Sequence, residues 1–178
     1  MVDITQLKHH INEEIRNCQQ RLADFEQELD TYKEQLRVLQ SHIESWVAAL
    51  EIDGVKIHYD DSAHTLEKFD ETFQITLQEQ TVSFGSCKLH VEPEEQYLHG
   101  NRILLFASSD EDDIKEIIES EGEYYFADLQ FGQKRDLSKY EPLTEETFYK
   151  LLYGWLRARV PRLPRPAWLP KTGFQKKA

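Results

Sequence analysis

The 178-residue chain contains only two cysteines and no apolar stretch long enough to cross a membrane. Two cysteines do not make the disulfide framework of a small secreted domain. A membrane-spanning helix needs about 20 mostly apolar residues, and the polar N-terminus lacks the apolar core of a signal peptide. The sequence therefore predicts a cytoplasmic protein with no transmembrane segment.

Glycine is also scarce, with seven in the chain. None belongs to a phosphate-binding loop, and neither Cys18 nor Cys87 stands in a sequence that marks a catalytic nucleophile. The acidic run from Asp110 to Asp113 is explained as the first turn of a short helix, where negative charge is favourable. We therefore expect no enzyme, no catalytic residues and no cofactor.

The densest group of metal-capable side chains follows the first expected strand. It consists of His58, Asp60, Asp61 and His64. Imidazole and carboxylate groups at such spacing can hold a divalent ion, which makes a metal-dependent hydrolase one alternative function. Aspartate is also common in turns, so an ordinary solvated loop explains the same residues. We expect no metal site here.

Charge is divided unevenly along the chain, whose net charge is −12. Residues 157–178 hold seven Lys or Arg and no acidic residue, so the preceding part carries −19. Because an acidic surface repels phosphates, nucleic acid or an anionic membrane is expected to bind only through the basic C-terminal tail. The acidic part suggests a further alternative, an inhibitory or immunity-type protein that blocks a basic surface.

The dominant pattern is an apolar repeat between Ile4 and Leu50. Its steps are three or four residues, and from residue 15 they alternate strictly, as in the heptads of a coiled coil. The seam comprises Ile15, Cys18, Leu22, Phe25, Leu29, Tyr32, Leu36, Leu39, Ile43, Trp46 and Leu50. No other expected helix could cover a stripe of about 70 Å, so we predict that residues 1–51 pair with another copy.

The positions beside this seam favour a parallel, in-register dimer. Arg21 would face Glu26 of the other copy, and Glu28 would face Lys33, so both charged pairs attract. Aromatic residues in the seam leave a trimer or tetramer as alternatives. A further alternative is a long helix that lies along its own globular domain.

Residues 52–160 are expected to form a small α+β domain with a mostly antiparallel sheet of about five or six strands. Strands are predicted at 55–59, 73–77, 82–84, 87–91, 103–107 and 124–131. Residues 60–71 are expected to be a polar loop. Two helices are expected to cover the sheet, one starting at Ser108 or Ser109 and one over 144–160 with an N-cap at its start.

Residues 161–178 are expected to be a basic, proline-rich tail, because this stretch holds four of the six prolines. The candidate partner-binding residues are Arg162, Arg165, Trp168, Leu169 and Lys171. Docking of the tail on the acidic domain of its own chain is the alternative. The sequence as a whole predicts a non-catalytic, homo-oligomeric adaptor or assembly protein that presents α+β domains to another protein.

Overall fold

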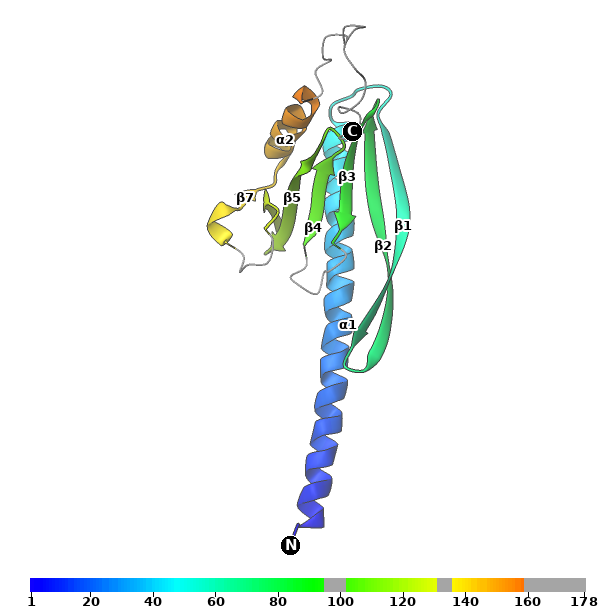
Figure 1. Ribbon diagram of the computed structural model, residues 1–178, viewed down its shortest axis with the longest axis vertical. Helices are drawn as coiled ribbons and strands as arrows, with labels where there is room; N and C mark the ends of the chain where they lie inside the picture. Colours follow the sequence, from blue (N-terminus) through cyan, green and yellow to red (C-terminus); the bar gives the residue numbers. More distant parts are fainter. Residues whose placement is uncertain (95–101, 131–135, 159–178) are drawn as a thin grey trace, which may run out of the picture.

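The computed structural model describes residues 1–94, 102–130 and 136–158. They form a long helix α1 (Ile4–Ala48), a seven-stranded antiparallel sheet and a second helix α2 (Glu145–Arg157), as Figure 1 shows. The predicted α+β class and the long N-terminal helix are confirmed. Within these residues we find no helix with the length and apolar character needed to span a membrane.

The strands lie side by side in chain order, so each one pairs with its neighbour in sequence. They are β1 (Lys56–Lys68), β2 (Glu71–Phe84), β3 (Cys87–Pro93), β4 (Ile103–Ala107), β5 (Asp110–Ser120), β6 (Glu123–Asp128) and β7 (Glu141–Pro142). A short 3-10 helix, η2 (Leu137–Lys139), precedes β7. The strand predicted at 103–107 is confirmed as β4, the fourth of the seven.

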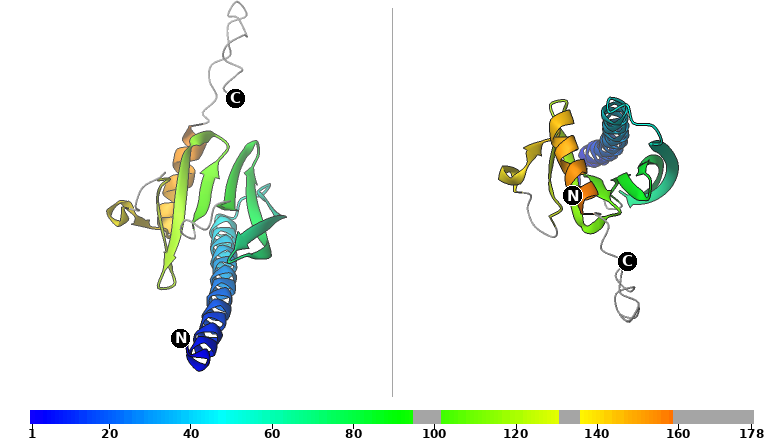
Figure 2. Two further views of the ribbon diagram at one scale, coloured as in Figure 1. Left: turned by 60° about the horizontal axis from the view of Figure 1, so that its bottom comes forward. Right: turned by 90° about the horizontal axis from the view of Figure 1, so that it is seen from above.

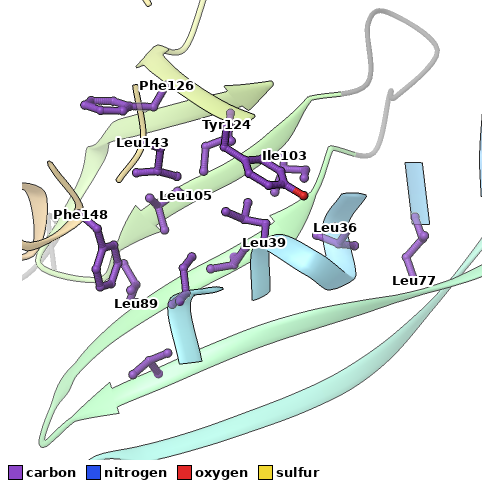
Figure 3. Close-up of a cluster of buried hydrophobic side chains, with 14 of the residues drawn as sticks. Leu36, Leu39, Leu77, Leu89, Ile103, Leu105, Tyr124, Phe126, Leu143 and Phe148 are labelled. Atoms are coloured by element: carbon purple, nitrogen blue, oxygen red, sulfur yellow. The ribbon is translucent and has the colours of Figure 1, made fainter. Parts of the chain in front are cut away.

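Both helices pack on one face of the sheet and share one hydrophobic core with it (Figure 2). The buried α1 side chains lie between Phe25 and Val47, and they contact inward-facing residues of β2 to β6. Figure 3 shows Leu36 and Leu39 of α1 beside Ile103, Leu105 and Tyr124 in this core. The C-terminal half of α1 is therefore part of the same folded body as the sheet.

The β1–β2 hairpin twists so strongly that both of its faces reach α1. Leu77 and Val82 are five residues apart and so point to opposite faces of β2, yet each is at most 1% exposed in the same core. Strand β2 pairs with β1 in one unbroken register, so no bulge accounts for the switch of its buried face between Leu77 and Val82. Strong twist is typical of two-stranded ribbons, and the two strands cross in Figure 1.

Helix α2 confirms the helix expected over 144–160, with slightly shorter bounds. The Thr144 side chain accepts a hydrogen bond from the Thr147 amide, and the Thr147 side chain accepts one from the Thr144 amide. This reciprocal pair is a capping box. The ring centroids of Trp46 and Phe148 lie 5.4 Å apart, and the Tyr149 hydroxyl donates to the Trp46 carbonyl at 2.6 Å, so α2 packs beside the end of α1.

Three predictions for the sheet domain are wrong. The polar loop expected over 60–71 is most of β1, a turn and the start of β2; its polar residues belong to an edge strand with solvent on one side. The helix expected after Ser109 is strand β5, whose isoleucines pair with β4 and β6. The second covering helix is thus α1 itself, and the sheet has seven strands instead of five or six.

Candidate functional site

The apolar seam of α1 passes from buried to exposed near Phe25. Phe25 is 5% exposed, whereas Ile4, Leu7, Ile11 and Ile15 are 67%, 47%, 50% and 51% exposed. At 100° per residue all of these side chains lie on one face of the helix. Together with the partly exposed Cys18 and Leu22 they form what we call the free seam, residues 4–22. Figure 1 shows this end of α1 projecting beyond the sheet.

The tip of the β1–β2 hairpin packs against the N-terminal end of the buried part of the seam. The Phe25 ring centroid lies 4.9 Å from that of Phe73 and 6.4 Å from that of Phe69, both edge-on. The Lys68 ammonium lies 4.5 Å from the Phe25 centroid, in cation–π geometry. Phe69 itself remains 38% exposed, so the tip has an apolar side chain in solvent next to the free seam.

The backbone of this tip is unusual for its sequence. Phe69 and Asp70 adopt φ values of +54° and +60°. A two-residue hairpin turn of this type normally has asparagine, aspartate or glycine at both positions, because a bulky residue is disfavoured at positive φ. Asp70 suits its position, but a phenylalanine at the first turn position departs from this pattern, so the residues alone do not indicate the turn.

The predicted pairing residues fall into two groups. Phe25, Leu29, Tyr32, Leu36, Leu39 and Ile43 are at most 8% exposed and pack on the sheet and α2 of their own chain. Trp46 and Leu50 are partly buried against the same core. The alternative of a helix lying along its own domain therefore describes residues 25–48. Ile15, Cys18 and Leu22 belong to the free seam, for which pairing between copies stays a prediction.

Four hydrogen bonds from side chains to backbone carbonyls fix the rotation of α1 on the sheet. The Tyr32 hydroxyl donates to the Arg102 carbonyl at 2.6 Å, and the Tyr124 hydroxyl donates to the Gln35 carbonyl at 2.7 Å. The Gln40 and Gln80 amides donate to the Gln78 and Gln40 carbonyls at 2.8 Å and 2.9 Å. Burial, the largest cause, raises the pKa of Tyr124 to about 12, and nearby Glu119 acts in the same direction.

The candidate metal ligands all lie on β1, where they do not converge. The His58 Nε2 atom is 2.9 Å from Asp60 Oδ1, and His64 Nε2 is 2.8 Å from the Ser62 hydroxyl. Asp61 points to the other face, where it lines a groove beside α1. Among the described residues no three or more His, Cys, Asp or Glu side chains gather in a geometry that could hold a metal ion.

A buried charge network lies on the sheet face away from α1. Glu116 is 0% exposed, and Arg102 donates to it at 2.7 Å and to Glu94 at 2.8 Å and 2.5 Å. The Tyr140 hydroxyl also donates to Glu116. The hydrogen bonds that Arg102 donates to Glu94 raise the pKa of Arg102, burial opposes this shift, and Glu116 adds to it. Because Arg102 is held between the two carboxylates by several hydrogen bonds, the network is suited to hold strands together.

A second network joins α2 to β5 and β6. Lys115 lies between Asp113 at 2.9 Å and Asp128 at 2.5 Å, and the Trp155 indole donates to Asp113 at 2.9 Å. Burial lowers the pKa of Lys115, but its hydrogen bonds to the two aspartates outweigh this and leave the pKa raised. A lysine that is held in its cationic form is a poor nucleophile or base.

The candidate tail residues Arg162, Arg165, Trp168, Leu169 and Lys171 lie outside the described residues. We found no match of the chain to a protein family model, to a characterised protein or to a solved structure. The candidate site is the free seam, with Phe69 at its inner end, because its apolar side chains are exposed on one face of α1.

Proposed function

We propose that this protein is a non-catalytic assembly or adaptor protein that self-associates through the free seam and presents its α+β bodies to another protein. The observation that carries the proposal is the stripe of aliphatic side chains on the projecting end of α1, four of them about half exposed or more. Single exposed apolar residues are common on protein surfaces, whereas a continuous stripe marks an interaction site.

The length of the projecting segment supports the same conclusion. Residues 4–22 span about 28 Å at 1.5 Å per residue. In proteins such helices are stabilised mainly by packing of their apolar face. A partner that covers the free seam supplies that packing.

A second copy of the chain is the partner that fits this surface best. Residues 1–24 hold three basic and four acidic residues, a net of −1, so two copies of this segment repel each other little. Each copy brings the same apolar stripe at helical spacing, as in self-pairing coiled coils. Complete burial of a side chain of this size stabilises by about 1.5–3 kcal/mol, so two seams together can offset the entropy of association.

A charge placed in the free seam tests this proposal. We expect the native chain to sediment as a dimer at micromolar concentration in analytical ultracentrifugation, and Ile11→Lys to sediment as a monomer. Asn17→Lys is the matched control, because it adds the same charge about 120° around the helix from Ile11, outside the apolar stripe of the free seam, and should remain dimeric. A native chain that is monomeric at this concentration would overturn the proposal.

Partner recruitment is assigned, as part of the same proposal, to the basic tail. Its composition supports this: seven cations from Arg157 onward accompany Trp168 and Leu169. Aromatic and arginine side chains dominate the energetics of many interfaces. Two free cysteines, one of them buried, support a reducing compartment such as the cytosol.

A further inference from the structure

We infer that the two copies pair antiparallel, with their free seams fully overlapped and the N-terminus of each helix reaching the β1–β2 hairpin tip at Phe69 of the other. This inference rests on the proposed self-association and specifies its geometry. Three features of the described residues carry it: the position of the hairpin on the seam, the distribution of charge, and the strained apolar turn at Phe69.

The hairpin blocks a parallel arrangement. Paired helices pack about 8–10 Å apart, so in a parallel dimer each seam would face the other helix along its whole length. From Phe25 onward that side of α1 is already occupied by Phe69 and Phe73 of its own chain. A parallel partner helix would therefore collide with the hairpin immediately beyond Leu22.

An antiparallel partner meets no such obstacle. Its helix begins at Ile4, so with full overlap Ile4 lies level with Leu22 of the first copy and the partner helix ends where the hairpin begins. Each free seam is then covered along its length. The two folded bodies lie at opposite ends of the paired segment.

Charge favours the same arrangement. Residues 1–24 carry −1, so residues 25–178 carry the remaining −11. A parallel dimer would place two such acidic bodies side by side. The antiparallel overlap separates them by about 28 Å of helix, which is several times the screening length of about 8 Å at physiological ionic strength.

The hairpin tip has the chemistry of a contact surface. The turn itself would be better served by asparagine and glycine, because Phe69 and Asp70 both have positive φ. Strained positions of this kind are retained where the side chain has a use. Phe69 is 38% exposed and lies next to Phe25, and the Arg21 guanidinium is 5.7 Å from its ring centroid. The first turn of an antiparallel partner covers this ring.

Cysteine crosslinking distinguishes the two orientations. In a parallel, in-register dimer Cys18 meets its counterpart directly. With full antiparallel overlap, which is centred on residue 13, the two Cys18 residues are about 15 Å apart along the axis, too far for a disulfide. Residue 11 of one copy is instead level with residue 15 of the other.

The experiment oxidises the dimer mildly with copper–phenanthroline. The native chain should give no Cys18 disulfide. In a Cys18→Ala background, Ile11→Cys and Ile15→Cys chains should crosslink when mixed and not when oxidised separately. A Cys18 disulfide in a proven dimer would overturn the antiparallel orientation and leave self-association intact. Absence of the 11–15 disulfide in a proven mixed dimer would overturn full overlap, whereas a monomeric native chain would overturn both proposals.

The contact at the hairpin tip has its own test. We expect Phe69→Asn to weaken dimerisation about tenfold, as loss of an aromatic interface anchor does. The same substitution in the Ile11→Lys monomer reports the body alone, where the unfolding midpoint in urea should change little because relief of the turn offsets the lost contact with Phe25. Unchanged dimer affinity would overturn the contact between the partner helix and Phe69.

Discussion

Phe25 and Phe73 meet edge-on with their ring centroids 4.9 Å apart, and this contact is where α1 enters the folded body. On its C-terminal side the apolar seam is part of a hydrophobic core, and on its N-terminal side the same seam is exposed. Substitutions of one chemical type along a single helical stripe are therefore expected to have two different effects.

The first prediction compares Leu36→Ala with Leu7→Ala in the Ile11→Lys monomer. Leu36 is 1% exposed in the core and Leu7 is 47% exposed. Leu36→Ala should lower the free energy of unfolding by about 2–5 kcal/mol, because it leaves a cavity. Leu7→Ala should change it by less than about 0.5 kcal/mol. Urea denaturation followed by circular dichroism measures both, and equal effects would contradict the boundary at Phe25.

The second prediction concerns the buried charge network. Glu116→Gln should lower the free energy of unfolding by about 3–5 kcal/mol, because it breaks a buried ion pair with Arg102 and also weakens the other hydrogen bonds to the same carboxylate. Tyr140→Phe deletes only one donor to the same carboxylate and should cost about 1.5–3 kcal/mol. Denaturant titration of the two variants gives the order, and a larger effect for Tyr140→Phe would contradict it.

The third prediction is a loss of stability at alkaline pH. The pKa of Tyr124 is raised from 10.0 to about 12, mainly by burial. Above pH 10 the unfolded state therefore loses its phenolic proton while the folded state keeps it, and the linkage relation gives a negative slope. The contribution of Tyr124 is complete below pH 10 and lost by pH 12, a decline of about 2 kcal/mol.

Urea denaturation at intervals between pH 9 and 12 measures this decline. Tyr124→Phe is the control, since it removes the titrating group and should have a shallower pH dependence than the native chain. The other tyrosines titrate in both proteins, so the difference between the two curves isolates Tyr124. Parallel curves would contradict the prediction.

The fourth prediction concerns the tail. A chain that ends at residue 160 should keep its melting temperature within about 2 °C of the full-length chain, because residues 161–178 lack an apolar periodicity with which to join a core. Capture of the partner should be lost, and Trp168→Ala should account for most of that loss. If truncation lowers the melting temperature by several degrees, the tail instead docks on its own body.

The extent of α1 could be predicted from the sequence because a helix has a local period. The element that covers the seam of α1 could not be predicted, since the stripe from Phe25 to Ile43 has the same spacing whether a second helix or a sheet packs on it. No other helix expected from the sequence is long enough to cover the seam. A strongly twisted hairpin that reaches α1 with both faces supplies that cover without showing continuous apolar alternation.

Strand β5 could not be predicted from the sequence for a related reason. Ile114, Ile117 and Ile118 have helical spacing and follow four acidic residues that suit a helix N-terminus. This segment is a strand because it pairs with β4 and β6, and such non-local contacts leave no signal in the local sequence. The apolar stripe of the free seam could be recognised from the sequence, but Phe69, at its inner end, could be placed there only from the structure.

The order in which the chain is made gives the long helix a separate significance. Synthesis runs from the N-terminus, so residues 4–48 leave the ribosome before any strand that covers them. The Gln35 carbonyl can accept its hydrogen bond only after Tyr124, 89 residues later, has been synthesised. The Trp46 carbonyl likewise needs Tyr149, 103 residues later. During that interval the whole seam is open, and neighbouring nascent chains on one messenger RNA present identical helices to each other. The proposed self-association would therefore be able to begin before either body has folded.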